Sequence, residues 1–296
     1  MSHLHNVAVR PDGEVREEAG WIGPPGERIF VFRHLPPEPR AALVVCSPVG
    51  GEGDSNYRRE VLLARLIAHR GIAVQRHHWR GTGNSDDDAA RLTFESMVHD
   101  TCRAIDSLAT VTDAPTFVLG TRLSSFVAAE VTARYRCRAL SLWHPPSSGG
   151  AYFRELGRLL RVNKLAQAAG RSLDSPRTFR DEVESGVSEV GGYQIHQAYY
   201  QSMIDRELGD VTLPSDTDVQ LVHFGGSSIP KVAQGCLDAW AAGGSRVASA
   251  VVSQPELWWF APDDSAEDRR PVTAEAVAVT GDWFTTLTSD LREQPL

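Results

Sequence analysis

One short turn carries the residue with the clearest chemical potential in this chain. It reads Gly120-Thr121-Arg122-Leu123-Ser124 and lies between an apolar run and a segment rich in small residues. The sequence therefore predicts a strand, a tight turn and a helix here. Such a turn suits nucleophilic catalysis when its tip is a serine, but here the tip is Arg122. A cation at a helix N-terminus is unfavourable by a few tenths to about 1 kcal/mol, so Arg122 must have a partner or a use.

Histidines stand where several predicted strands end. His77, His78, His144 and His223 do so, four of the ten histidines in the chain. A histidine at such a place is more often a hydrogen-bonded core group, but it can also be a general acid or base or a metal ligand. We expect His78 and His144 to be the acid/base pair among them.

Three other side chains are weaker candidates for a nucleophile. Ser124 and Ser125 begin the helix after the turn and are rotated away from its tip, so we expect Ser124 to bind substrate rather than attack it. Cys46 ends a predicted strand with His78 as a conceivable base, but buried strand thiols are usually inert.

The elements that must position these residues alternate between short apolar strands and amphipathic helices. Strands are expected at 28–33, 41–46, 72–79, 115–119, 139–144, 218–223 and 246–252. Helices are expected at 57–69, 94–109, 124–135, about 230–242, and 273–287. This alternation predicts an α/β fold with a doubly wound, mostly parallel sheet.

Two segments depart from the alternation. Residues 147–210 have helical patterns at 152–161 and 193–208 but no convincing buried strand, which predicts a helical cap or lid. Residues 1–27 are polar and turn-rich, and they are expected to be an N-terminal arm, with an early strand as the alternative. The core then comprises residues 28–146 and 211–290. Ligands of open parallel sheets bind outside the carboxyl ends of the strands, so any activity should come from the loops there.

The order of elements and the spelling of two loops resemble the α/β-hydrolase superfamily. Residues 76–87 (RHHWRGTGNSDD) are similar to that family's D-x-R-G-x-G-x-S stretch, and residues 117–130 (FVLGTRLSSFVAAE) stand where its G-x-S-x-G turn belongs. Arg122 occupies the serine position. Gly226 occupies the expected acid position, no histidine follows His223, and the base position falls near Trp258 and Trp259. A Ser-His-Asp triad therefore cannot be assembled in the family's chain order.

One subgroup departs from the superfamily in the same way. The chain resembles the second type of exosortase A system-associated hydrolase, which also has arginine in the turn. The resemblance covers roughly residues 28–285 and includes Arg58-Arg59, Leu142-Trp143-His144-Pro145, Val190-Gly191-Gly192-Tyr193 and, loosely, Trp258-Trp259. It implies the α/β-hydrolase fold and says little about the reaction, since the hydrolase label of that subgroup rests on its fold.

In the layout that this resemblance implies, the acids closest to Arg122 are Glu52 and Asp54. Arg122 is then either ion-paired to one of them or an anchor for an anionic substrate group, and the two interpretations are compatible. Glu52 is either a general base or a solvated loop acid. Trp143, Trp258 and Trp259 are expected to pack in the core or to wall an aromatic substrate pocket.

Composition and charge limit the partners of this chain. The net charge is −8, which disfavours binding to nucleic acid or to an anionic membrane. The four cysteines are widely spaced, so neither a disulfide framework nor a metal site is expected, and no cofactor is predicted. No apolar run is long enough for a membrane span, and we expect a cytoplasmic protein. The oligomeric state stays open, with a homodimer among the alternatives.

Two classes of function follow from these residues. The first is an atypical enzyme that acts by non-covalent acid/base or water-mediated chemistry on an anionic acyl- or peptide-type biosynthetic intermediate. The second is a non-catalytic pseudo-hydrolase that binds a small molecule, a peptide or a partner protein. The sequence favours the enzyme.

Overall fold

The computed structural model describes residues 5–12, 14–168, 177–253 and 270–293. Its main sheet consists of β1 (His5–Asp12), β2 (Val15–Ile22), β3 (Ile29–Leu35), β4 (Ala41–Cys46), β5 (Ile72–His77), β6 (Thr116–Thr121), β7 (Ala139–Trp143), β10 (Asp218–Phe224) and β11 (Arg246–Val252). The spatial order is β1-β2-β3-β5-β4-β6-β7-β10-β11. The strands from β5 to β11 in this order are parallel, and β1, β2 and β3 pair antiparallel. The predicted doubly wound, mostly parallel sheet is thus confirmed.

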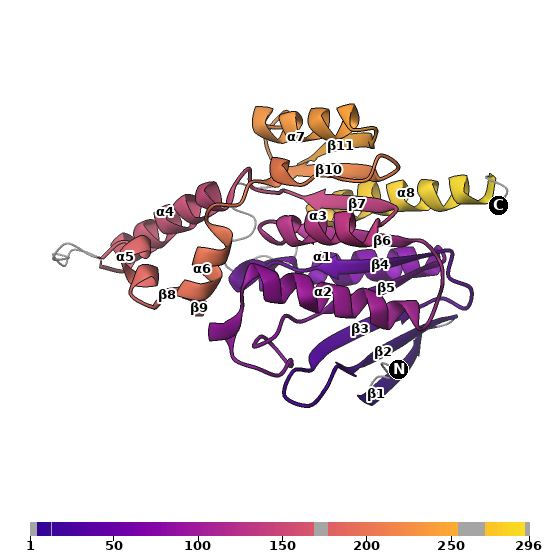
Figure 1. Ribbon diagram of the computed structural model, residues 1–296, viewed down its shortest axis with the longest axis horizontal. Coiled ribbons are helices and arrows are strands. Elements are labelled where there is room, and N and C mark those ends of the chain that lie inside the picture. Colours follow the sequence, from indigo (N-terminus) through magenta and orange to yellow (C-terminus); the bar gives the residue numbers. More distant parts are fainter. Residues whose placement is uncertain (1–4, 13, 169–176, 254–269, 294–296) are drawn as a thin grey trace.

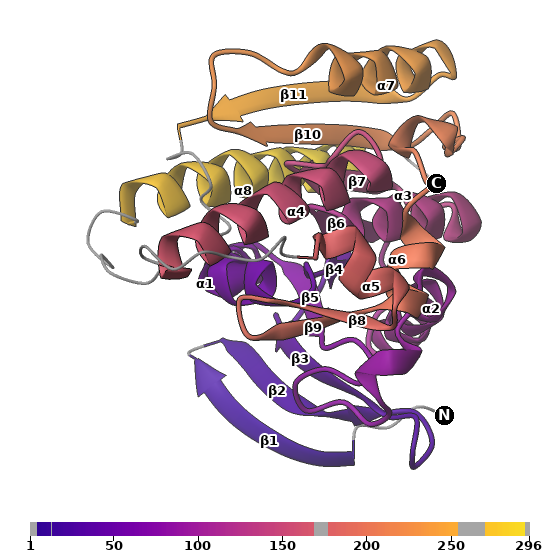
Figure 2. The same ribbon diagram turned by 90° about the vertical axis from the view of Figure 1, so that its left-hand side faces the viewer.

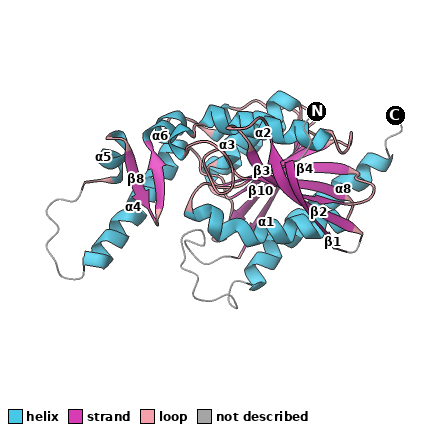
Figure 3. Cartoon of the chain, turned by 90° about the horizontal axis from the view of Figure 1, so that it is seen from below, coloured by secondary structure: helices cyan, strands magenta, loops and turns pink. Residues whose placement is uncertain are grey.

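Helices cover both faces of this sheet (Figure 1). They are α1 (Gly51–His69), α2 (Phe94–Ala109), α3 (Ser124–Tyr135), α7 (Lys231–Ala242) and α8 (Arg270–Glu293). The view from below shows α1 and α8 on one face and α2 and α3 on the other (Figure 3). Every residue of β4, β5 and β7 is buried, as expected for parallel strands covered on both sides.

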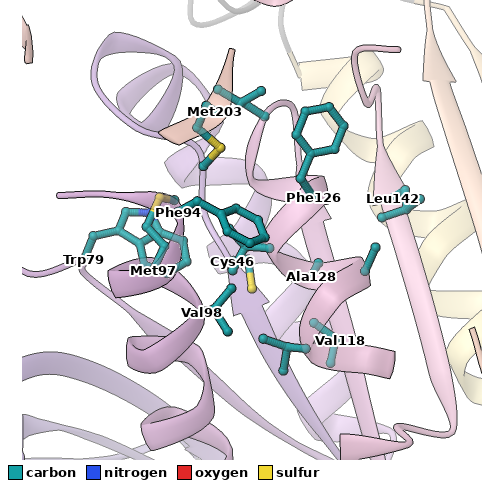
Figure 4. Close-up of a cluster of buried hydrophobic side chains, with 14 of the residues drawn as sticks. Cys46, Trp79, Phe94, Met97, Val98, Val118, Phe126, Ala128, Leu142 and Met203 are labelled. Carbon is teal, nitrogen blue, oxygen red and sulfur yellow. The ribbon is translucent and has the colours of Figure 1, made fainter. Parts of the chain in front are cut away.

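The side chains of β4 alternate between two apolar clusters because successive residues of a strand point to opposite faces. Leu43 and Val45 pack with α1 and α8, whereas Val44 and Cys46 pack with α2 and α3. Figure 4 shows the second cluster, which includes Cys46 of β4, Phe94 and Met97 of α2 and Phe126 of α3. These two clusters hold the loops at the carboxyl edge of the sheet in fixed positions.

The N-terminal segment extends the sheet, so the early strand is right and the loose arm is wrong. Strand β2 pairs with β3 over its whole length. Its acidic residues are paired: Glu17 accepts from Arg65 Nε at 2.9 Å, and Glu18 lies 3.8 Å from Arg33 Nη1. This pairing explains why so polar a sequence forms a strand.

The 147–210 insertion lies beside the carboxyl edge of the sheet, at the left of Figure 1. It contains α4 (Gly149–Ala168), α5 (Phe179–Glu184), β8 (Val187–Val190), β9 (Tyr193–His196), α6 (Gln197–Met203) and the 3-10 helix η2 (Leu208–Asp210). Its two ends meet where Ser148 pairs with Glu207. None of the helices that the structure describes is long and apolar enough to cross a membrane.

Two expectations about these elements were wrong. Residues 187–196 form an antiparallel hairpin of partly exposed strands, where the sequence suggested no buried strand and a helix from residue 193. Gly191 and Gly192, with φ of 59° and 84°, form its two-residue loop, because a twisted hairpin favours left-handed residues there. Helix α1 begins at Gly51 rather than at Tyr57, and its acidic first turn suits the positive helix N-terminus.

We predict that Gly120→Ala destabilises the protein. Gly120 directly precedes the turn, and its backbone lies close to α3. A Cβ at this position would lie 2.5 Å from Ala128 Cβ and 2.8 Å from Ser125 Cα. Overpacking of this kind costs about 1–3 kcal/mol. The matched control is Gly235→Ala in α7. A Cβ there meets nothing within 4 Å, so this substitution should be neutral or stabilising. Urea unfolding of both variants checks the difference, and equal effects would contradict it.

Candidate functional site

The turn after β6 keeps the strained backbone that the sequence predicts. Arg122 has φ of 54°, in the left-handed region, and α3 follows from Ser124. The Arg122 N–H donates to the Trp143 carbonyl at 2.9 Å, and the Ser125 N–H donates to the Arg122 carbonyl at 3.0 Å. A left-handed conformation costs a non-glycine residue roughly 1–2 kcal/mol. The surrounding structure therefore holds Arg122 at the tip of the turn against a local preference.

The Arg122 side chain is buried, with 2% of its surface exposed, and two carboxylates compensate its charge. Its Nε lies 3.1 Å from Glu52 Oε1, and its Nη2 lies 3.2 Å from Glu155 Oε1 in α4. The guanidinium carbon also lies over the Tyr152 ring, 5.5 Å from the ring centroid. The sequence offered two alternative partners for Arg122, Glu52 and Asp54, and the structure pairs it with Glu52. We call Arg122, Glu52, Glu155 and Tyr152 the arginine centre.

Glu52 is the most deeply buried acid of the arginine centre. Burial raises its pKa, while the charge of Arg122 opposes this shift. Its second oxygen accepts a hydrogen bond from the Tyr152 hydroxyl at 3.1 Å. Burial raises the pKa of Tyr152 well above its ordinary value, so the phenol keeps its proton and remains a donor. The other predicted acid, Asp54, accepts instead from the Tyr193 hydroxyl of the 147–210 insertion.

Two histidines lie beside the arginine centre, at the ends of neighbouring strands. His144 also has a left-handed backbone, with φ of 48°, and its ring stacks on that of His223 at 4.4 Å. The Phe224 N–H donates to its Nδ1 at 3.0 Å, which assigns the proton of the neutral ring to Nε2. Burial and the charge of Arg122 lower the pKa of His144 to about 2. At neutral pH this ring is therefore a hydrogen-bond donor and a poor base.

The structure does not bring His78 and His144 together. His78 follows β5 and packs against Phe30 and Phe32, with its Nδ1 accepting from the Asn84 N–H at 3.1 Å. The strands β5 and β7 are three positions apart in the sheet, about 14 Å at the usual strand spacing. The histidine that accompanies His144 is His223.

The candidate nucleophiles are engaged elsewhere. Ser124 Oγ donates to the Ser47 carbonyl at 2.8 Å, and Ser125 Oγ donates to the Gly120 carbonyl at 3.2 Å. Both serines are buried. Burial raises the pKa of Cys46 to about 12, so its thiol is not ionised at neutral pH. Because its hydroxyl proton is already donated to the Ser47 carbonyl, Ser124 could donate to a substrate only by leaving this bond.

Of the three predicted tryptophans, only Trp143 lies within the described residues, and it packs in the core. Trp143 is fully buried, and its Nε1 donates to Thr280 Oγ1 of α8 at 2.9 Å. It belongs to the apolar cluster under α1 and α8, so its role in the structure is core packing. Trp258 and Trp259 lie outside the residues that the structure describes.

A second buried polar cluster supports the loop after β4. Glu60 accepts from Ser47 Oγ at 2.6 Å and from Asn56 Nδ2 at 2.8 Å. Burial raises the pKa of Glu60, and the positive charge of Arg76 opposes this shift. The Ser47 carbonyl in turn accepts from Trp79 Nε1 at 2.9 Å. These bonds fix the loop that leads into the first turn of α1 and hence position Glu52.

Sequence reasoning missed Tyr152, Glu155 and Glu60. The first two are three residues apart on α4 and the third is four residues from Asn56 on α1, so each spacing places its pair on one helix face. These helical spacings can be read from the sequence, but they do not predict which face of a helix meets Arg122. Within the described residues, no group of three or more histidine, cysteine or acidic side chains is placed to hold a metal ion.

Comparisons with known proteins establish the fold. No family model matches the chain, and no curated protein matches it. Its structure is similar to a carboxyl esterase from Bacillus coagulans, with a TM-score of 0.60, 13% identity, and coverage of 92% of this chain and 99% of that one. It is also similar to Est1E from Butyrivibrio proteoclasticus with ferulic acid bound (TM-score 0.58, 15% identity, 87% and 95% covered). A third similar structure is a proline iminopeptidase from Mycobacterium smegmatis, with a TM-score of 0.58, 15% identity, and coverage of 93% of this chain and 100% of that one. The chain has the α/β-hydrolase fold.

We predict that Glu52→Gln destabilises the protein by about 3 kcal/mol, because it leaves a buried guanidinium short of one negative charge. Glu155→Gln should cost less than about 1 kcal/mol, since the Glu155 side chain is one-third exposed. In the double variant Arg122→Met/Glu52→Gln the cost should fall below the sum of the single costs by at least about 1 kcal/mol. Guanidinium unfolding of these three variants, of Arg122→Met and of the wild type measures the costs. Additive costs, or equal costs of the two glutamate variants, contradict this ranking.

We predict that His77 makes the protein less stable in acid. Burial lowers the pKa of His77 to about 4, below its ordinary value near 6.5. Between these values the unfolded chain binds a proton that the folded chain does not, so stability falls as the pH drops through this window. The variant His77→Phe should therefore gain about 2 kcal/mol relative to the wild type on going from pH 7.5 to 5.

Urea unfolding at the two pH values measures this gain. The control is Leu62→Phe, at an exposed position of α1 that carries no titratable group, and its effect should be the same at both pH values. An effect of His77→Phe that does not change with pH contradicts the prediction.

Proposed function

We propose that this chain is an atypical α/β-hydrolase-fold enzyme that acts without a covalent intermediate. Its chemistry is acid/base or water-mediated, and its substrate is an anionic acyl- or peptide-type biosynthetic intermediate. The observation that carries the proposal is the strained backbone at Arg122 and at His144: Arg122 is paired with the buried Glu52, and its charge acts on His144. Strain of this kind costs about 1–3 kcal/mol per residue and gathers at functional sites.

Each group of the arginine centre has a role in this proposal. Arg122 binds the anionic group of the substrate, which takes the place of the one-third exposed Glu155 carboxylate at Nη2. Glu52 accepts a proton from water or from the substrate, since its raised pKa makes it a stronger base than an exposed glutamate. The Nε2–H of His144 stabilises negative charge that develops on the substrate.

A second candidate is the pseudo-hydrolase that binds without turnover. The observation that favours it is that both oxygens of Glu52 and two nitrogens of Arg122 already have protein partners. Under this alternative the arginine centre is a structural tie between α1, α3 and α4. The two candidates differ in whether Glu52 is needed for turnover or only for stability.

The test begins with a fluorophosphonate probe, which should not label the protein because no activated serine is present. A panel of N-acyl amino acids, acidic acyl thioesters and dipeptides is then incubated with the protein and followed by mass spectrometry. We expect turnover of one class, retained in Ser124→Ala and Ser125→Ala and reduced at least a hundredfold in Glu52→Gln, measured at a temperature where that variant is folded.

Three outcomes would decide against the proposal. Labelling of Ser124 or Ser125 overturns the absence of a covalent nucleophile. Turnover that survives Glu52→Gln removes Glu52 as the base. Saturable binding of a panel compound with no turnover, lost in Arg122→Ala, supports the pseudo-hydrolase instead.

A further inference from the structure

A large cavity that is open to solvent lies on the 147–210 insertion. Its volume is about 1110 Å³. Helices α4, α5 and α6 form its walls, and the insertion faces the viewer in Figure 2, with α4 above α5. None of the four residues of the arginine centre lines it. A cavity that can enclose a small molecule is a few hundred to about 1,000 Å³, so this one has room for a ligand of that class.

Five arginines line this cavity, all of them at solvent-exposed positions, in a chain whose net charge is −8. Arg154, Arg158 and Arg161 follow one another on α4 at spacings of four and three residues, which places them in a row about 10 Å long on one helix face. Arg177 and Arg180 line the cavity from residues at the start of α5. The cavity is therefore lined by guanidinium groups from two elements, α4 and the start of α5.

The charge of this lining is only partly compensated. Asp205 and Glu207 are the acids of the lining, and Arg180 pairs outside the lining with Glu184 at 2.7 Å. Within the described residues, Arg154, Arg158 and Arg161 have no ion pair. Like charges at such helical spacings are destabilising by about 0.2–0.5 kcal/mol per pair, so a bound anion would stabilise this face of α4.

The cavity also has an apolar and aromatic side. Phe153 and Phe179 stack at a centroid distance of 5.9 Å, and Tyr200 meets Phe153 edge-on at 4.9 Å. All three line the cavity, as does Leu160. An anion that carries an apolar body therefore matches the lining better than a bare ion does.

We propose that this cavity binds a small molecule that has a phosphate group and an apolar, aromatic or acyl body. Guanidinium groups bind phosphate oxygens in pairs of parallel hydrogen bonds, and several of them can share one phosphate dianion. The apolar part of the ligand lies against Phe153, Phe179 and Tyr200. The proposal is independent of the chemistry proposed for the arginine centre, because the two sites share no residue.

Helix α4 connects this cavity with the arginine centre. Tyr152 and Glu155 lie on the face of α4 that meets Arg122, and Arg154 and Arg158 lie on the face that lines the cavity. A ligand that orders α4 would therefore also order the contacts of Glu155. This link makes the cavity a site through which the insertion responds to a phosphorylated compound.

Isothermal titration calorimetry with 1-naphthyl phosphate, inorganic phosphate, 1-naphthol and a hexaglutamate peptide tests the proposal. We expect one site for naphthyl phosphate, at least tenfold tighter than for inorganic phosphate or naphthol, and weaker at higher salt. Arg158→Gln and Arg154→Gln should each weaken it at least tenfold. The control is Arg58→Gln, an exposed arginine of α1 that does not line the cavity and should leave binding unchanged.

Two results overturn the proposal. The first is that 1-naphthyl phosphate does not bind, or that it binds Arg158→Gln and the wild type with the same affinity. The other is tighter binding of the hexaglutamate peptide than of naphthyl phosphate, which assigns the cavity to an acidic polypeptide. Neither result depends on turnover of any substrate, so the proposal can fail while the proposed function stands.

Discussion

The compensation of one buried cation is the interaction on which the rest of this site depends. Arg122 stands at the tip of a strained turn, with 2% of its surface exposed. A guanidinium cannot lose its charge in a protein, so burial here is possible only if carboxylates accompany it. Glu52 meets it from the first turn of α1 and Glu155 from α4. Three segments far apart in the sequence are thereby held together by one charge, and the 147–210 insertion is tied to the sheet where a ligand of this fold would bind.

The same charge sets the properties of its neighbours. It opposes the rise that burial causes in the pKa of Glu52, and it adds to the fall that burial causes in the pKa of His144. The result is an acid whose ionised form is held by a partner and a histidine that remains neutral. Among the described residues, this site has a buried carboxylate and a neutral histidine beside an arginine, in place of the serine and the basic histidine of a serine-based site. The proposed acid/base chemistry rests on these properties.

Local patterns predicted the fold well and the site in part. The strands at 41–46 and 246–252 and the helices at 94–109 and 124–135 have the predicted bounds, because apolar periodicity and flanking turn residues define them. The arm at 1–27 and the hairpin at 187–196 were misjudged, since their strands are polar or short and gain stability from pairing with other elements. Of the site, the sequence predicted the turn with Arg122 at its tip and offered Glu52 and Asp54 as its possible partners, of which the structure pairs Glu52 with Arg122. It proposed His78 with His144, where the structure places His223 beside His144.

The sequence by itself predicted which chemistry to expect. The tip of the turn is an arginine, the resemblance places Gly226 at the acid position, and no histidine follows His223, so a Ser-His-Asp triad in the family's chain order is not expected. Only the tertiary structure decided what took its place. Which face of α4 meets Arg122, which histidine pairs with His144, and which arginines surround a cavity all depend on how helices and strands pack across long sequence separations. Periodicity describes one element at a time, whereas a buried charge is compensated by whichever carboxylates the packed elements bring within about 3–4 Å.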